Sequence, residues 1–375
     1  MNLAAGTTTG TTGVSNIRDI IGGSGNDSLT GDGGNNTITG NGGDDTLSGS
    51  GGDDLYIFNA GWGVDTVSDT SGSDTLDFTS ISTNLNVIIE SVIVTDGLGN
   101  ALTHSGNEIE SLLLGSGNDT IAISNGAATS VVVDAGAGND TLTYIGNTTA
   151  RTISLNGVGG TDGFDGTASG IGGFSNINAV VGGNGIDTLN GMNANGEWRM
   201  TNGTSGQYFS TNTFNFTGVE TLVGGSGADQ LLFTNYITAA NITLTNVGTL
   251  DGFDATEASF TGSFRNINSL TGSAGTDSLT GLSAASVWQI TSATSGTYTS
   301  TNTLTFSAIE NLIGNSVSDT LDYSASAIAR TITLTGAGAD GFNLTDAAFS
   351  GSFSNINTLV GSSATTDTLN GANAN

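Results

Sequence analysis

Oxygen-bearing side chains recur every nine residues near the start of the chain, in a setting that could bind a metal ion. Residues 22–57 read GGSGNDSLT, GDGGNNTIT, GNGGDDTLS and GSGGDDLYI, which are four tandem units at 22–30, 31–39, 40–48 and 49–57. The sixth position of each unit carries an oxygen, at Asp27, Asn36, Asp45 and Asp54. Carboxylate and carbonyl oxygens without His or Cys form a hard-oxygen site, which suits Ca²⁺.

Glycine-rich turns must position these side chains. Glycine tolerates positive φ and close backbone approach, so the turn carbonyls can point into one space. The three residues after each turn suit a short strand with its eighth-position side chain inward, at Leu29, Ile38, Leu47 and Tyr56. Stacked units would form a parallel coil with calcium between the turns. We expect these turn glycines to belong to the calcium sites: Gly23, Gly25, Gly31, Gly33, Gly34, Gly40, Gly42, Gly43, Gly49, Gly51 and Gly52.

The four units resemble the RTX nonapeptide repeat, G-G-x-G-x-D-x-U-x, a calcium-binding β-helix repeat. The resemblance implies a parallel β-roll, with two nonapeptides per turn and Ca²⁺ between successive turns on each side. Asp27, Asp45 and Asp54 match the ligand aspartate of the family. Asn36 keeps the oxygen but loses the charge, so its site should be weaker, and the second-position glycine is replaced at Asp32, Asn41 and Ser50. The alternative, a glycine-rich disordered linker, would not require an apolar residue every nine positions.

The composition gives a second argument for bound cations. The chain has 375 residues, a formal net charge of −29, and no Cys, Pro or Lys. Such acidity disfavours nucleic acids and anionic membranes as partners. In a compact state the acidic side chains would repel one another unless cations neutralised them, although the same acidity can also serve solubility. No apolar run reaches transmembrane length, so we expect no membrane insertion.

Long repeats follow the nonapeptides. RTISLNGVGGTDGFDG at 151 matches segments that begin at 241 and 330, which gives a period of about 90 residues and indicates a solenoid. Ninety divides into five coils of 18 or four of about 22 residues. NGANAN at 370–375 repeats NGMNAN at 190–195, so we expect the chain to be a fragment that stops inside a repeat.

These patterns predict an all-β fold, an elongated right-handed parallel β-roll and β-solenoid. The predicted organisation is a flexible segment at 1–13, a calcium β-roll at 14–58, an irregular β-solenoid continuation at 59–150, and tandem repeats over 151–375, divided into 151–240, 241–329 and a truncated 330–375.

Further acids occupy recurring turn positions. GSGNDTI (115–121) and GAGNDTL (136–142) make Asp119 and Asp140 secondary calcium candidates, with a plain solenoid corner as the alternative, since neither turn has a tandem partner in sequence. In the later repeats one motif position holds an acid that we interpret as a turn cap for backbone N–H groups, with calcium as the alternative. These acids are Asp187, Asp229, Asp277, Asp319 and Asp367. Another position holds Glu110, Glu220 or Glu310 in some units and Asn178, Asn268 or Arg18 in others, and this tolerance indicates a solvent face.

No catalytic residue is predicted. His104 is the only histidine, and its polar surroundings, ALTHSGNE, predict an exposed loop side chain rather than part of a triad. Carboxylate pairs could serve glycoside hydrolysis, but the acids recur by repeat, whereas an active site is normally unique. Trp198 and Trp288 are interpreted as core residues, with a sugar-binding platform as the alternative. Threonine alternation at 299–306 raises an ice- or carbohydrate-binding surface as a further alternative.

The sequence therefore predicts a non-enzymatic, calcium-stabilised structural or adhesive protein that is secreted or lies at the cell surface, such as a surface fibre, a surface-layer component or an adhesin stalk. We expect calcium as partner, with self-association or cell-surface and matrix glycans as further partners. The resemblance implies type I export, followed by folding on Ca²⁺ binding outside the cell. The alternative is an export and folding module of a secreted enzyme or toxin whose catalytic domain lies elsewhere.

Overall fold

The computed structural model describes residues 1–2, 17–90, 92–104, 109–316, 318–364 and 366–372. Residues 3–13 of the predicted flexible segment 1–13 lie outside these ranges. All regular elements in the described part are strands, so the predicted all-β parallel solenoid is confirmed. None of the described segments forms a helix with the length and apolar character that crossing a membrane requires. The chain forms two compact units, Met1–Asp187 with Thr211–Asn215, and Thr188–Ser210 with Phe216–Asn375.

The four nonapeptides build the first coils of unit one. Alternate nonapeptides enter alternate sheets, since β2 pairs with β4 and β3 pairs with β5, each parallel. Their register places Leu29 beside Leu47 and Ile38 beside Tyr56, and all four side chains are buried between the sheets. The strands of this segment are β1 Asp19–Ile21, β2 Ser28–Thr30, β3 Thr37–Thr39, β4 Thr46–Ser48 and β5 Leu55–Ile57.

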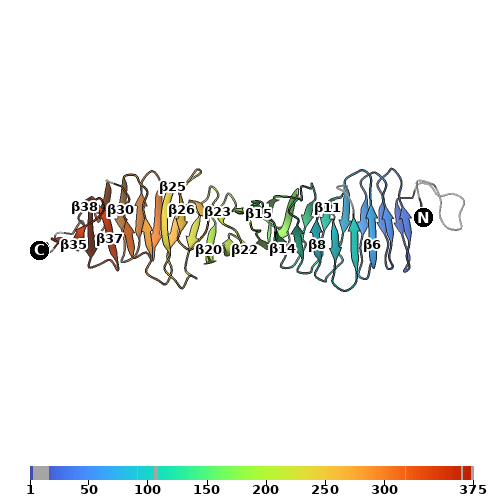
Figure 1. Ribbon diagram of the computed structural model, residues 1–375, viewed down its shortest axis with the longest axis horizontal. Coiled ribbons are helices and arrows are strands. Elements are labelled where there is room, and N and C mark those ends of the chain that lie inside the picture. Colours follow the sequence, from blue (N-terminus) through green and yellow to red (C-terminus); the bar gives the residue numbers. More distant parts are fainter. Residues whose placement is uncertain (3–16, 91, 105–108, 317, 365, 373–375) are drawn as a thin grey trace. The chain divides into compact units, whose positions relative to one another are not determined.

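Longer coils complete unit one, and they also alternate between two sheets (Figure 1). These strands are β6 Val64–Ser68, β7 Asp74–Asp77, β8 Asn86–Ile89, β9 Ile93–Thr95, β10 Ala101–His104, β11 Ile109–Leu113, β12 Thr120–Ile123, β13 Val132–Asp134, β14 Thr141–Thr143, β15 Thr152–Val158, β16 Phe164–Ala168, β17 Gly173–Ile177 and β18 Ala179–Val181.

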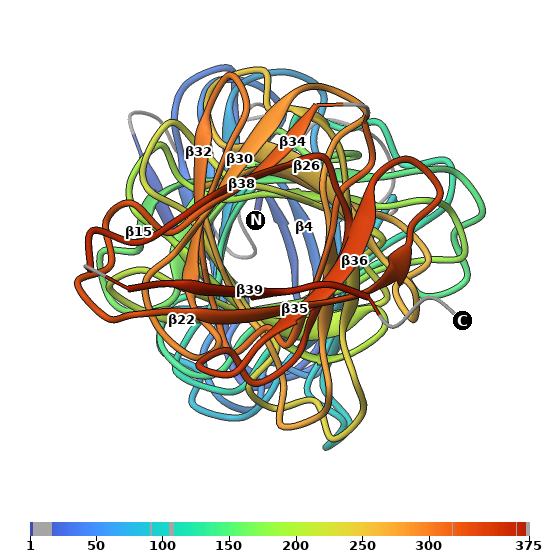
Figure 2. The same ribbon diagram turned by 90° about the vertical axis from the view of Figure 1, so that its left-hand side faces the viewer.

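Unit two repeats the same design from β19 onward, and β22 begins within unit one. Figure 2 shows β35 and β39 of one sheet on the opposite side from β38 of the other. The strands are β19 Thr188–Asn190, β20 Glu197–Asn202, β21 Ser205–Phe209, β22 Thr213–Thr217, β23 Thr221–Val223, β24 Gln230–Leu232, β25 Asn241–Val247, β26 Phe253–Glu257, β27 Ser263–Ile267, β28 Ser269–Thr271, β29 Ser278–Thr280, β30 Ser286–Ile290, β31 Gly296–Thr299, β32 Thr303–Ser307, β33 Asn311–Ile313, β34 Asp319–Asp322, β35 Thr331–Ala337, β36 Phe342–Asp346, β37 Ser352–Ile356, β38 Thr358–Val360 and β39 Thr368–Asn370.

The long repeats fold back on themselves instead of winding as simple coils. In one sheet the order is β23, β27, β26, β25, β29, where β27 is parallel to β23 and β25 is parallel to β29. Strands β25, β26 and β27 form an antiparallel meander between them. The 90 residues 221–310 thus fill five strand positions of this sheet before β33 begins the next repeat at Asn311. The second sheet does the same with β24, β28, β32, β31 and β30.

Aromatic rows fill the space between the sheets of unit two. Trp288 packs against Tyr298, with ring centroids 4.6 Å apart, and against Phe306 at 6.2 Å. Trp198 is buried in the same way against Tyr208 at 4.6 Å. The interpretation of Trp198 and Trp288 as core residues is confirmed, and their burial removes them as a sugar-binding platform.

A left-handed asparagine fixes each meander of the first sheet. Asn176, Asn266 and Asn355 have φ of 59°, 55° and 56°, a conformation that asparagine tolerates better than other residues with a side chain. Asn266 also donates from Nδ2 to the carbonyl of Gly224 at 3.1 Å and accepts the Leu250 N–H at 3.2 Å. The side chain therefore ties the meander to the preceding coil.

Asn266→Ala should lower the free energy of unfolding of unit two by about 2–4 kcal/mol. The substitution forces alanine into positive φ and removes two buried hydrogen bonds. Urea denaturation followed by tryptophan fluorescence measures the change. Asn246→Ala, at an exposed position of β25 in the same repeat, is the matched control and should stay within about 0.5 kcal/mol of wild type. Equal effects of the two substitutions would contradict this role.

Candidate metal sites

A ladder of charge-assisted hydrogen bonds runs along one edge of the roll. The backbone N–H of Asp27 donates to Asp45 Oδ1 at 2.7 Å, and the N–H of Asp45 donates to Asp65 Oδ1 at 2.9 Å. Each donor residue lies just before its strand, so its N–H faces the next coil at a point where no strand carbonyl accepts it. A carboxylate at the same position of that coil satisfies this otherwise unpaired group.

The opposite edge carries a second ladder. The N–H of Asn36 donates to Asp54 Oδ1 at 2.6 Å, and the N–H of Asp54 donates to Asp74 Oδ1 at 2.8 Å. The N–H of Asp74 then donates to Glu110 Oε2 at 2.9 Å. Asp65 and Asp74 lie beyond the four nonapeptides, so both ladders extend past the segment that the sequence singled out.

The two isolated half-motifs are neighbours in space. The N–H of Asp119 donates to Asp140 Oδ1 at 2.7 Å, and Asp119 Oδ1 itself accepts the Leu85 N–H at 2.7 Å. Asp140 continues the ladder to Asn178 Oδ1 at 2.9 Å. The tandem partner that each turn lacks in sequence is thus supplied by the fold, because β12 and β14 are paired in parallel.

The glutamate position is part of the ladder, so its interpretation as a solvent face is wrong. Glu310 Oε2 accepts the Asp277 N–H at 2.8 Å, as Glu110 does for Asp74. Asn268 Oδ1 accepts the Asp229 N–H at 2.8 Å. Glutamate and asparagine can replace one another because both present an acceptor oxygen within reach of the N–H.

An outer ladder of fifth-position side chains was missed in the sequence. The N–H of Asp44 donates to Asn26 Oδ1 at 3.0 Å, and the N–H of Asp53 donates to Asn35 Oδ1 at 3.0 Å. The signal was present, because every nonapeptide carries Asn or Asp at its fifth position. Adjacent acids in one turn therefore have separate tasks, one inside and one outside.

The second oxygen of the inner ladder acids has no protein partner. Oδ2 is buried without a hydrogen bond in six residues of unit one: Asp45, Asp54, Asp65, Asp74, Asp119 and Asp140. Residues 19–150 contain 18 acidic residues and no Lys or Arg. Because an unpaired buried carboxylate is costly, these oxygens require a cation or a proton.

First-position glycines leave space for such a cation. A Cβ on Gly22 would lie 2.6 Å from the carbonyl oxygen of Gly40 and 2.7 Å from Asp27 Oδ2. A Cβ on Gly40 would collide with Asp45 Oδ2, and one on Gly31 would lie 2.5 Å from the carbonyl oxygen of Gly49. Carboxylate and carbonyl oxygens from successive coils thus converge beside each glycine. This donor set fits Ca²⁺, which prefers several oxygen ligands.

The structure places the other predicted calcium-site glycines in the turns, but it does not test whether their carbonyls bind a metal. Gly43, with φ of 118°, stacks so closely on the turn one coil earlier that its Cβ would lie 2.6 Å from the carbonyl carbon of Gly25. The remaining ones lie in the same stacked turns, at Gly23, Gly33, Gly34, Gly42, Gly51 and Gly52.

Unit two satisfies several ladder acids with its own donors. Asp277 accepts the Ser273 N–H and hydroxyl, both at 2.7 Å. Asp319 accepts the Ser286 hydroxyl at 2.5 Å and the Ser316 N–H at 2.9 Å. The predicted turn-cap role is confirmed for these acids. Ser273 follows the opening glycine of its turn, GSAGTD, where the first nonapeptide has a second glycine, whereas Ser316 is the third residue of its turn.

The chain also neutralises one buried acid with arginine. Arg330 Nη1 lies 3.0 Å from Asp346 Oδ2, and both side chains are buried. Its guanidinium also lies over the Tyr323 ring, 4.6 Å from the centroid. Unit two therefore has a basic side chain that neutralises a buried carboxylate, whereas residues 19–150 contain no Lys or Arg.

Burial shifts the titration of the ladder acids. Desolvation raises the pKa of Asp65, Asp74 and Asp140 to about 7, above an ordinary value near 4. It raises the pKa of Asp54 and Asp119 to about 6. Without a cation, Asp65, Asp74 and Asp140 are therefore partly protonated near neutral pH, and Asp54 and Asp119 become so in mildly acidic solution.

His104 lies inside the structure, so its prediction as an exposed loop residue is wrong. It is the last residue of β10 and only 2% exposed. Its side chain continues the inward alternation of Leu102, which is also buried. The polar sequence around it concealed this alternation.

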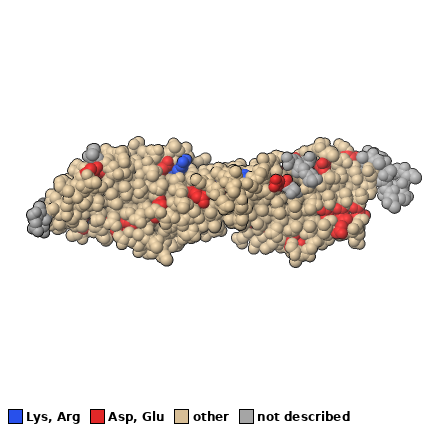
Figure 3. Space-filling model, viewed as in Figure 1, with Lys and Arg blue, Asp and Glu red and all other residues tan. Residues whose placement is uncertain are grey.

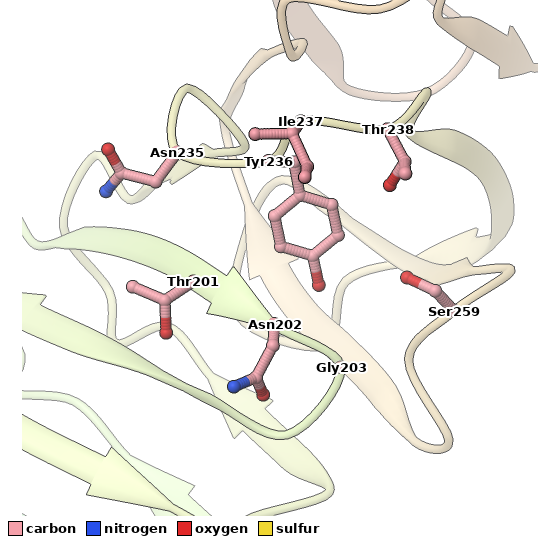
Figure 4. A pocket seen from close by; sticks show the side chains of 8 residues that line it. All are labelled: Thr201, Asn202, Gly203, Asn235, Tyr236, Ile237, Thr238 and Ser259. Atoms are coloured by element: carbon pink, nitrogen blue, oxygen red, sulfur yellow. The ribbon is translucent and has the colours of Figure 1, made fainter.

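A surface groove in unit two is a second concave feature. It has a volume of about 420 Å³ and is lined by hydroxyl, amide and aliphatic groups (Figure 4). The Tyr236 ring stands between Asn202 and Ser259 but is only 5% exposed, so it offers no open face for stacking on a sugar. Ile237 at the rim is 94% exposed.

Comparison with known protein families matches three segments of this chain that contain ladder residues. Residues 21–56, 124–143 and 214–232 match the RTX calcium-binding nonapeptide repeat, in 4 copies. The last segment includes Asp229, whose turn GGSGAD keeps its glycines and whose carboxylate oxygens are buried without partners. None of the curated proteins matches the chain. The predicted resemblance is confirmed: the chain carries RTX calcium-binding nonapeptide repeats.

The calcium-free protein should lose stability as pH rises from about 4 to about 7. In this window the folded state binds more protons than the unfolded state, because the folded pKa values are raised, so the free energy of unfolding falls with pH. Thermal melting followed by circular dichroism should give a higher midpoint at pH 5 than at pH 8. A midpoint that is constant or rises across this window would contradict the raised pKa values.

Asp140→Asn and Asp319→Asn should differ in their effect on calcium binding. Asp140 has a buried oxygen without a partner, whereas both oxygens of Asp319 accept protein hydrogen bonds. We expect Asp140→Asn to lower the calcium stoichiometry measured by isothermal titration calorimetry. Asp319→Asn should leave the stoichiometry unchanged while costing about 1–3 kcal/mol of stability. Loss of calcium in the Asp319 variant alone would reverse the assignment.

Proposed function

We propose that this chain, which carries RTX calcium-binding nonapeptide repeats, is a calcium-stabilised extracellular structural or adhesive protein that folds on calcium binding after export. One observation carries the proposal: six ladder carboxylates are buried with an unpartnered oxygen, in a stretch that contains no basic residue. The proposed calcium ligands are the side-chain oxygens of the ladder residues and carbonyls of their glycine-rich turns, at Asp27, Asn36, Asp45, Asp54, Asp119 and Asp140.

The mechanism is ion-gated folding. Without calcium, folding brings carboxylates of successive coils together and removes them from water, which opposes the folded state. The converging oxygens belong to different coils, so the unfolded chain has no equivalent site. Calcium therefore stabilises the folded form by mass action, by about 2.7 kcal/mol per site at a free concentration of 100 Kd. Millimolar extracellular calcium would fill such sites, whereas the low calcium of the cytoplasm would leave the N-terminal roll unfolded for type I export.

A scaffold role fits the placement of the chemistry. The ladders repeat from coil to coil, and unit two continues the design with carboxylates that its own serines and Arg330 satisfy. On the face in Figure 3, acidic atoms gather toward the N-terminal strands, and much of the remaining surface is uncharged. Such a molecule suits a surface fibre, a surface-layer component or an adhesin stalk, in which the calcium roll folds first and the later repeats add length.

The threonine alternation at 299–306 does not favour an ice-binding surface. Thr299 and Thr303 do lie side by side, with their hydroxyl oxygens 3.2 Å apart. The preceding repeat, however, has Gln207, Phe209 and Asn215 in place of Thr297, Thr299 and Thr305. A flat threonine array therefore does not continue from one repeat to the next.

A calcium titration followed by far-UV circular dichroism tests the proposal. We expect a cooperative gain of β signal with calcium and a much weaker response to magnesium, which demands a smaller octahedral site. Asp45→Ala should shift the calcium midpoint upward, because it removes a ladder acceptor and a ligand together. A complete β signal in calcium-free buffer, with a melting temperature that calcium does not change, would refute ion-gated folding.

A further inference from the structure

Three buried carboxylates meet at the end of the nonapeptide segment. Asp54, Asp69 and Asp74 are 2%, 8% and 0% exposed. One oxygen from each lies within 4.8 Å of an oxygen from each of the other two. Asp69 belongs to none of the four nonapeptides. It opens the related segment DTSGSDTLD at 69–77, at the position where every nonapeptide has its first glycine.

The position of Asp69 brings a third acid into a glycine cradle. A Cβ on Gly49 would collide with Asp54 Oδ2 and with Asp69 Oδ2, so both carboxylates point into the same space between coils. Asp54 Oδ2 and Asp74 Oδ2 are buried and have no hydrogen-bond partner. In the described part of the chain the ion pairs are Arg199–Glu197 and Arg330–Asp346, so no basic side chain neutralises the three acids.

Fixed donors hold Asp54 and Asp74 through one oxygen each, and Asp69 through both. The Tyr56 hydroxyl donates to Asp69 Oδ2 at 2.5 Å and accepts the Gly49 N–H at 2.5 Å. Asp69 Oδ1 accepts the Thr70 N–H at 2.6 Å. Asp54 Oδ1 and Asp74 Oδ1 are held by the ladder. Burial and the neighbouring Asp69 raise the pKa of Tyr56, so the hydroxyl keeps its proton and remains a donor.

We propose that Asp54, Asp69 and Asp74 form a three-carboxylate cation site, which binds calcium or a trivalent lanthanide more tightly than the nonapeptide sites do. The charge of −3 exceeds that of a site built from two ladder acids, and the number of charged ligands tunes affinity for such cations. Asp69 determines this preference, since it supplies the carboxylate that the nonapeptide pattern lacks. The proposal rests in part on the proposed function, because Asp54 belongs to the fourth nonapeptide, whereas Asp69 and Asp74 lie beyond the four nonapeptides.

Terbium binding to the full chain tests this site. The protein is first folded in calcium, as judged by far-UV circular dichroism, and is then titrated with Tb³⁺ while tyrosine-sensitised emission is recorded. Wild type should show one tight component, and Asp69→Asn should weaken that component at least about tenfold. Asp77→Asn is the matched control, because it removes the same charge at the end of β7 while its carboxylate contacts only Thr79. Tyr56→Phe should reduce the emission through loss of a nearby sensitiser.

The outcomes separate a ligand role from a merely structural one. If Asp69→Asn lowers the melting temperature but leaves the terbium titration unchanged, Asp69 only accepts the Tyr56 hydrogen bond and the proposal is overturned. An equal loss in Asp69→Asn and Asp77→Asn would also overturn it, as an effect of net charge. If the β signal is complete in calcium-free buffer while the Asp69-dependent terbium component persists, the proposed ion-gated folding fails and this site stands.

Discussion

The structure depends on a backbone N–H at each turn that no strand partner can satisfy. In a parallel stack this N–H, just before the strand, points toward the next coil, where a carboxylate or amide oxygen accepts it at 2.6–2.9 Å from Asp27 to Glu110. The requirement recurs in coils of different length, and Asp, Asn or Glu fulfils it. It explains why an oxygen-bearing side chain returns at this position even where the glycine pattern is lost.

The second carboxylate oxygen decides how each part of the chain is stabilised. In residues 19–150 the turns have glycine beside the acid and no base nearby, so this oxygen stays open to a cation. In unit two, the backbone N–H groups of Ser273 and Ser316 donate to this oxygen, and Arg330 neutralises Asp346. Six acids of residues 19–150 receive no such donor. We therefore expect calcium dependence mainly in the N-terminal part.

Local periodicity predicted the roll because its parallel contacts recur at a fixed spacing of 18 residues, as between Asp27 and Asp45. The buried eighth positions, the short strands and the ladder role of Asp45 follow directly from a nine-residue unit. The meanders were not predictable in this way, because β25, β26 and β27 pair antiparallel and so reverse the order in which the chain enters the sheet, with a left-handed Asn266 in β27. The same limit hid the Asp119–Asp140 pair and Asp69, since both arise only when coils of unequal length are stacked.

Hydrogen exchange of the ladder amides, measured by mass spectrometry with and without calcium, tests the account most directly. The ladder N–H groups of residues 27–54 and 119–140 should exchange far more slowly with calcium than without it. Three ladder N–H groups of unit two should be protected in both conditions. They belong to Ala240, Asp277 and Asp319, and they donate to Asp277 Oδ1, Glu310 Oε2 and Asn357 Oδ1. Equal protection of residues 27–54 and 119–140 with and without calcium would contradict the claim that a cation completes the ladder.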